Sequence, residues 1–365
     1  METKKKKSWT RWLVPGFIFQ SIVIGGGYGT GAEIKEYFLT QGFVGGILAS
    51  LVTLVIWAVL CAITFEFTRV FKTYDYKSLM GKLLGKAGFL YEICYIVLLL
   101  IVLGVVNSTA FNMVTDLTGA TGWIGIALLS AGIIFLVIGG TEAIEKALSF
   151  WSYILYAVYI LFMIICFTKF GSNIAAQWGA HEVASGWFVS GAKYSFYNLG
   201  IVPAMLYTVR ECDTRKEAVG QGLIAGAIGV IPAVLLLVVL AGCVPATLEA
   251  EVPVTAVFQA LNMPWLYWTF EIVLFGTLIE TGTGFIKAVD DRIEVSYTTS
   301  GKTLPKWVRP VVACVSVAIG IAVAQFGLTG LIAKGYGTVC WGFLVLYVLP
   351  MISLGIYKIA KADKK

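Results

Sequence analysis

The chain has 365 residues, of which 58% are hydrophobic and only 13% are charged, and its mean hydropathy is +0.85. Soluble domains carry about 25% charged residues, and a water-soluble fold cannot cover this much apolar side chain. The composition therefore argues against a soluble enzyme, a disordered chain and a nucleic-acid-binding protein. It predicts an integral membrane protein that has the lipid bilayer as its partner.

The cysteine and histidine content argues against several kinds of site. The seven cysteines are odd in number and include no CxxC pair, which is unlike a disulfide framework or a zinc site. His181 is the only histidine, so a His-based catalytic triad or metal site is not expected. We expect no enzymatic activity and no cofactor other than a coupling ion, Na⁺ or H⁺.

Ten segments are apolar over about the 20 residues that a membrane-spanning helix requires. No period-2 alternation is present, so a membrane barrel is not predicted. We therefore expect an all-α integral membrane fold with ten transmembrane helices. They are predicted at 10–38, 42–69, 88–114, 122–139, 148–168, 188–209, 217–245, 264–288, 308–326 and 329–357.

The basic residues predict the orientation of these spans. With the N-terminus inside, the 27 Lys and Arg residues all fall on the inner side except Lys35, Lys169, Lys193 and Lys334. Basic residues collect in cytoplasmic loops of membrane proteins. We therefore predict a multi-pass protein of the cytoplasmic membrane with both termini in the cytoplasm, which also explains the net charge of +6.

Two predicted spans are interrupted near their middle. The first contains Ile24–Gly31, with five glycines, and the sixth contains Tyr197–Ala204, with Gly200 and Pro203. Glycine and proline both disfavour helix. Matching interruptions in spans 1 and 6 predict two repeats of five helices, about 10–169 and about 188–357, within one transporter domain over 1–365. Because five is odd, the second repeat must be inverted.

Interrupted helices at membrane depth are the best sequence indication of a transport site. Half-helices that begin near Ala32 and Pro203 would direct positive N-termini at the gap, which suits a carboxylate. Half-helices that end near Ile24 and Tyr197 would leave free carbonyls, which suit an ammonium or Na⁺. Together these groups fit an amino-acid zwitterion. The alternative is that the glycines only allow helices to pack closely.

The five-plus-five pattern with broken helices 1 and 6 resembles the LeuT fold of the amino acid–polyamine–organocation superfamily. The segment GGGYGTGAEIKEYF (25–38) resembles the first-helix motif of the YkvI-like amino acid permeases. In that family Arg or Gln often follows the last glycine, where this chain has Ala32. The resemblance implies a secondary transporter with its substrate between helices 1, 3, 6 and 8.

Candidate substrate-binding residues surround the two interruptions. Glu33 is a carboxylate at membrane depth that could recognise an amine or carry a proton, or pair with Lys35 in an outer vestibule. Asn107 could bind substrate or join two helices. The full set is Gly25, Gly26, Gly27, Tyr28, Gly29, Thr30, Gly31, Glu33, Asn107, Tyr197, Asn198 and Gly200.

Candidate ion-coupling residues lie on the eighth span. Thr277 and Thr281 share one face of a helix, and the resemblance implies a Na⁺ site between helix 1 backbone and helix 8 hydroxyls. Each threonine could instead bond to its own helix. Glu280 makes proton coupling the alternative. The sequence assigns no role to three further charged residues, Glu66, Glu271 and Lys334.

These observations predict a cation-coupled secondary transporter that moves an amino acid or similar small organic solute across the membrane by alternating access. Two alternatives use the same sequence. A solute-binding sensor or receptor subunit on this fold would bind without net transport, and a membrane enzyme would turn over a lipid. The solute and the bilayer are the expected partners.

Overall fold

The computed structural model describes residues 9–362 and 364, except the side chains of 9, 10, 140–150, 152, 153, 204, 295 and 299. The described residues form helices and contain no strand. The longer elements are α1 (Val14–Val23), α4 (Phe43–Phe71), α6 (Gly88–Thr118), α7 (Trp123–Gly179), α8 (Trp187–Leu199), η4 (Val202–Glu211), α9 (Arg215–Ala241), α12 (Pro264–Thr299) and α13 (Val308–Ala324).

Shorter elements connect or continue these helices. The last span is a run of short α- and π-helical pieces rather than one regular helix. The shorter elements are η1 (Trp9–Trp12), α2 (Gly26–Gly29), α3 (Ala32–Tyr37), η2 (Leu39–Gln41), α5 (Tyr76–Leu84), η3 (Gly85–Ala87), α10 (Ala246–Glu249), α11 (Pro253–Leu261), α14 (Leu328–Gly330), η5 (Leu331–Tyr336), α15 (Gly337–Phe343), η6 (Leu344–Val348), η7 (Met351–Gly355) and α16 (Ile356–Ala362).

The bundle has an apolar outer surface. Within the described residues, six helical segments are long and apolar enough to cross a membrane, and three more apolar helices are shorter. Large side chains on their outer faces are exposed, including Phe135 at 76% and Val55 and Ile160 at 60%. Water would oppose such exposure, whereas lipid accommodates it. The chain is therefore a multi-pass membrane protein.

The helix α7 differs from the prediction of two separate spans at 122–139 and 148–168. Helical structure continues without a loop over 57 residues. Gly132 lies against Ile279, yet Trp151 Nε1 donates to the carbonyl of Val273 at 2.9 Å. In a straight helix, residues 132 and 151 would be ~28 Å apart, whereas both contact one short stretch of α12. Thus α7 folds back on itself, and the predicted break in helical structure is wrong.

The most extensive contact between two helices joins α4 and α9. Gly222 and Gly226 are one turn apart on α9 and face Ala62 and Ala58, one turn apart on α4. A Cβ atom at Gly226 would lie 2.5 Å from the Cα of Ala58. Small residues at this spacing let two helix backbones approach closely. This pair forms the base on which the broken first helix is held, because α1 also packs on α9.

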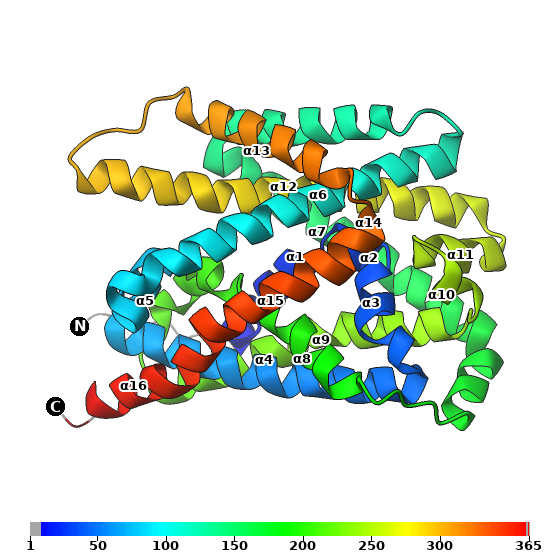
Figure 1. Cartoon of the computed structure of the whole chain (residues 1–365), viewed down its shortest axis with the longest axis horizontal. Coiled ribbons are helices and arrows are strands. Elements are labelled where there is room, and N and C mark those ends of the chain that lie inside the picture. The colour runs from blue at the N-terminus through cyan, green and yellow to red at the C-terminus, as the bar shows by residue number, and fades with distance from the viewer. Residues whose placement is uncertain (1–8, 363, 365) are drawn as a thin grey trace.

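The broken helix α1–α3 runs through the middle of the bundle. It packs on α6 and α12 on one side and on α8 and α9 on the other. Figure 1 shows this arrangement, with α12 and α13 above α1 and with α4, α8 and α9 below it. The interruptions in the chain are therefore surrounded by helices, as irregular backbone in a membrane must be.

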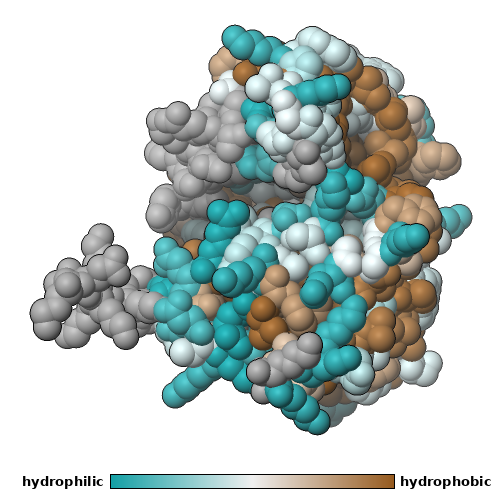
Figure 2. Space-filling model, turned by 90° about the vertical axis from the view of Figure 1, so that its left-hand side faces the viewer, coloured by the Kyte–Doolittle hydropathy of each residue, from teal (hydrophilic) through white to brown (hydrophobic). Residues whose placement is uncertain are grey.

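The basic segments predicted on one side do lie at one end of the bundle. The Lys358 ammonium donates to the carbonyl of Lys82 at 2.6 Å, and Arg11 pairs with Glu211 at 3.5 Å. Figure 1 places α5 and α16 at this end, and Figure 2 views it with hydrophilic side chains over the end face and hydrophobic ones along a flank. Lys4 to Lys7, which contributed to the predicted orientation, lie outside the described residues.

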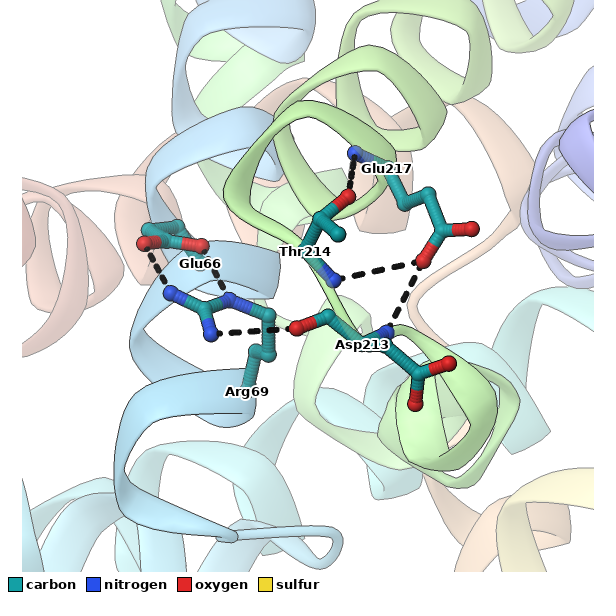
Figure 3. A network of polar contacts seen from close by, with 5 residues as sticks. All are labelled: Glu66, Arg69, Asp213, Thr214 and Glu217. Atoms are coloured by element: carbon teal, nitrogen blue, oxygen red, sulfur yellow. Dashed lines mark hydrogen bonds and ion pairs between the residues drawn. The ribbon is translucent and has the colours of Figure 1, made fainter.

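At this end, Glu66 receives a structural role that the sequence did not indicate. Its carboxylate accepts two hydrogen bonds from Arg69, at 2.7 and 2.8 Å, and Arg69 also donates to the carbonyl of Asp213 (Figure 3). Thr214 and Glu217 then form a capping box at the start of α9. Glu66 therefore belongs to a polar network that joins the C-terminal end of α4 to the start of α9.

Candidate functional site

The first helix is interrupted where its glycines predict. Helix α1 ends at Val23. Gly31 then adopts φ +79°, a left-handed backbone conformation that residues other than glycine rarely adopt. The hydroxyl of Thr30 donates to the carbonyls of Gly26 and Gly27, at 2.8 and 3.1 Å. Thr30 therefore stabilises the interruption itself.

The sixth span is interrupted at the matching place. Helix α8 ends at Leu199, and the 3₁₀ helix η4 begins at Val202 with Pro203 in its first turn. The carbonyl of Gly200, at the interruption, accepts a hydrogen bond from the hydroxyl of Tyr91 on α6. Both freed backbone segments thus find protein partners, as membrane depth requires.

The two interruptions are joined by one side-chain contact. Glu33, in the first turn of α3, is 4% exposed, and its Oε2 accepts a hydrogen bond from the Tyr197 hydroxyl at 2.5 Å. Its carboxyl group folds back over Gly27, where a Cβ would lie 2.9 Å from the Glu33 Cγ. The glycine at 27 is therefore what makes room for the carboxylate.

Tyr336, which the sequence analysis missed, completes this contact. Its ring stacks on Tyr197 with centroids 4.5 Å apart and an interplanar angle of 10°. Tyr336 ends the π-helical segment η5 and lies between Gly335 and Gly337. Such π-helical turns are frequent at functional sites. In the sequence, the two glycines that flank Tyr336 were the signal that could have identified this residue.

A cavity lies where these elements meet. Six predicted residues line it, and they come from both interruptions and from α12. Its lining consists of Ile22, Val23, Gly25, Gly26, Glu33, Leu98, Val102, Tyr197, Asn198, Ile201, Thr281, Phe285 and Tyr336. The structure therefore brings helices 1, 3, 6 and 8 together around one space, with a contribution from the last span.

Other predicted residues lie nearby but do not line the cavity. Tyr28 is fully buried, and its hydroxyl has no partner among the described residues. Gly29 packs against Leu274, and Gly200 against the ring of Phe343. These positions therefore act on the backbone and packing around the cavity.

Asn107 is not at the cavity that α6 helps to form. Its Nδ2 donates to the carbonyl of Leu103 at 2.7 Å, and its amide faces Gly320 of α13. The α6 residues at the cavity are Leu98 and Val102 instead. Asn107 therefore lies outside this cavity, because its direction around α6 turns it toward α13, as the alternative of a contact between two helices anticipates.

The α12 hydroxyls form the hydrogen bonds that the alternative interpretation anticipates. Thr277 Oγ1 donates to the Val273 carbonyl at 3.0 Å, and Thr281 Oγ1 to the Thr277 carbonyl at 2.9 Å. Thr281 nevertheless lies against Gly25, where a Cβ would be 3.4 Å from its Oγ1. Glu280 keeps one buried carboxylate oxygen without a partner among the described residues. The α12 face beside the first interruption therefore presents the Thr281 hydroxyl next to two leucines, Leu274 and Leu278, which lie against Gly29 and Gly26.

The far end of the interruption is covered by α10 and α11. The Lys35 ammonium donates to the carbonyl of Ala250 at 2.6 Å, and the Val254 N–H donates to the carbonyl of Thr30 at 3.1 Å. Lys35 therefore points away from Glu33. The covering segment is bonded directly to the interruption that it covers.

Comparison with known proteins agrees with this architecture. No protein-family model matches the chain. The sequence is 25% identical over 214 residues to the uncharacterized membrane protein YkvI of Bacillus subtilis (strain 168), which covers 58% of this chain and 60% of that protein. The match thus spans less than two thirds of the relative's length.

Solved structures are similar over nearly the whole chain. A Na⁺-coupled sialic acid symporter matches with a TM-score of 0.69 and 13% identity, over 92% of this chain and 78% of its own. MhsT in complex with L-phenylalanine matches with a TM-score of 0.65 and 13% identity, over 98% of both chains. The chain has the LeuT fold. The first of these structural relatives is named as a symporter, which is a transporter and not an enzyme.

Proposed function

We propose that the chain is a cation-coupled secondary transporter that moves an amino acid or similar small organic solute across the cytoplasmic membrane. The observation that carries this proposal is the hydrogen bond between Glu33 and Tyr197, which joins two interrupted helices at a cavity between them. Such a site, open in turn to each side, is the basis of alternating access. The orientation with both termini in the cytoplasm belongs to the same proposal.

The packing of the bundle supports ten spans in two inverted repeats. Helix α1 packs on α9 as α8 packs on α4, and α6 packs on α13 as α12 packs on α7. In each comparison, the two helices of one pair lie five spans away from the two helices of the other pair. The contact between α1 and α9 therefore has its counterpart in the contact between α8 and α4, and the contact between α6 and α13 has its counterpart in that between α12 and α7. This relation is what a five-plus-five repeat predicts, with the two arms of α7 counted as the fourth and fifth spans.

The proposed solute and ion sites adjoin each other. Gly25, Gly26, Glu33, Tyr197 and Asn198 line the cavity from both interruptions and are the proposed solute contacts. The ion site would use the part of α12 beside Gly25, where Thr281 lies with Thr277 one turn before it, and Glu280 of the same helix is the alternative coupling group. Oxygen ligands suit a hard cation such as Na⁺, and a carboxylate can carry a proton. The similar symporter is Na⁺-coupled, and MhsT was solved with L-phenylalanine.

The test is solute flux into proteoliposomes that hold the purified protein, with Na⁺ and H⁺ gradients imposed separately. We expect one gradient to drive accumulation of a solute class. Na⁺ dependence that Thr281→Val abolishes would support the threonine site, and H⁺ dependence that Glu280→Gln abolishes would support the carboxylate. Solute binding without flux, in folded and correctly oriented protein, would contradict the proposal and indicate a sensor.

The Tyr197 hydroxyl offers a sharper prediction. Tyr197→Phe removes the donor to Glu33, so we expect initial uptake to fall by at least about tenfold, because a hydrogen bond to a buried charge contributes about 1.5–3 kcal/mol. Tyr194→Phe is the matched control: this neighbouring hydroxyl is buried without a partner among the described residues, and its removal should leave uptake unchanged. Equal loss in both variants would contradict the assigned role.

A further inference from the structure

The charge of the cavity is one-sided. Of the described side chains that line it, Glu33 is the one that is charged, and no Lys, Arg or His is among them. Lys35 is the nearest cation along the chain, and it is bonded to the carbonyl of Ala250 instead. The side chains that the structure describes therefore supply no positive group to this carboxylate.

The carboxylate itself is only partly satisfied. Oε2 accepts the Tyr197 hydroxyl, whereas Oε1, which lies over Gly27, accepts no hydrogen bond from a described residue. A carboxylate can accept about four hydrogen bonds, and a buried charge is costly unless it is paired. Glu33 is therefore an incomplete site that a cation from outside the protein would complete.

The remainder of the cavity suits a hydrocarbon group. Val23, Leu98, Val102, Ile201 and Phe285 line it with apolar atoms. The stacked rings of Tyr197 and Tyr336 adjoin the carboxylate, and aromatic rings attract organic cations. The lining thus combines one negative group with an apolar and aromatic wall.

We propose that the solute is a small organic cation, an ammonium attached to one apolar group, and that Glu33 recognises its charge. A carboxylate on the solute would meet no cationic side chain and would be repelled by Glu33. This inference rests on the proposed function and narrows its solute from amino acids in general to amines.

The test uses three probes that share a benzyl group and differ in the charged groups attached to it. They are 2-phenylethylamine, 3-phenylpropanoate and L-phenylalanine. Thermal unfolding of the purified protein is followed while each probe is titrated, because a ligand that binds the folded state raises Tm. We expect the amine to raise Tm and the carboxylate to have no effect. The zwitterion should require at least about ten times the concentration of the amine for the same shift in Tm.

Two variants identify the group that reads the charge. Glu33→Gln should weaken the response to the amine at least about tenfold, whereas Glu271→Gln, at a buried carboxylate outside the cavity, should leave it unchanged. Should Glu33→Gln fail to fold, the charge selectivity of the wild-type protein and of Glu33→Asp still tests the inference.

Three results would overturn it. They are a carboxylate probe as effective as the amine, an undiminished amine response in folded Glu33→Gln, and no amine response up to about 10 mM. This assay contains no gradient, so its failure differs from failure of the proposed function. Amine binding without flux would contradict transport alone, and driven uptake of an anionic solute would contradict this inference alone.

Discussion

Gly27→Ala is expected to lower solute uptake by about 10- to 100-fold while the protein still folds and inserts. A Cβ at this position would lie 2.9 Å from the Glu33 Cγ and 3.0 Å from its Cδ, and nearer still to Oε1. These atoms are the end of a flexible side chain, so they can move at small cost to the fold. Moving them separates the carboxylate from Tyr197, and a displacement of about 1 Å in a functional group can cost 100-fold.

The control for this change is Gly284→Ala on α12. A Cβ at Gly284 would meet no atom within 4 Å, so the substitution adds the same methyl group without displacing anything. Initial uptake rates in proteoliposomes, normalised to inserted protein, should separate the two variants. A second substitution, Glu33→Asp, shortens the acid and should partly restore uptake to Gly27→Ala. Wild-type uptake by Gly27→Ala would show that the position of the carboxylate does not matter.

The sequence predicted the place of the candidate site better than its contacts. The interruptions at Gly25–Gly31 and at Gly200 and Pro203 were predictable because glycine and proline act on their own backbone. The bond between Glu33 and Tyr197 was not, because it joins residues 164 positions apart. Such a contact depends on how the two halves of the bundle pack, which local propensity does not determine.

The misplaced and missed residues have equally physical causes. Asn107 and Val106 are neighbours in the chain, but successive side chains on a helix point about 100° apart. Val106 lies beside Gly26, whereas Asn107 turns to α13. A helix that is apolar on all sides has no hydrophobic face, so the sequence does not show which side chains point toward the cavity. Tyr336 was hidden for a related reason, since it is one of 17 tyrosines.

The helical connection between the two arms of α7 was missed for a different reason. The segment Gly139–Lys146, GGTEAIEK, has the glycines and charges of a loop, and apolar runs flank it on both sides. None of these residues forbids helix, and the chain continues its helical hydrogen bonding through them. Hydropathy therefore located the two apolar arms, but it could not tell a sharp bend in a helix from a loop.

Gly226→Leu is expected to act on the fold itself, in contrast to Gly27→Ala. A Cβ at Gly226 would lie 2.5 Å from the Cα of Ala58 and 2.7 Å from the carbonyl carbon of Trp57. Both are backbone atoms of α4, so no side chain can move aside to relieve the contact. Overpacking commonly lowers the stability of the fold by about 1–3 kcal/mol. Because this variant must separate two helix backbones, we expect a loss at or above the upper end of that range.

The measurement is the yield of monodisperse detergent-solubilised protein and its Tm, compared with Gly171→Leu. Gly171 lies on the exposed face of α7, where a Cβ would meet no atom within 4 Å, so the same side chain is added without a clash. We expect Gly226→Leu to lose most folded protein and Gly171→Leu to retain it. Because α1 packs on α9 beside this contact, any Gly226→Leu that does fold should also lose uptake. A stable, active Gly226→Leu would show that the α4–α9 contact does not hold the first interruption in place.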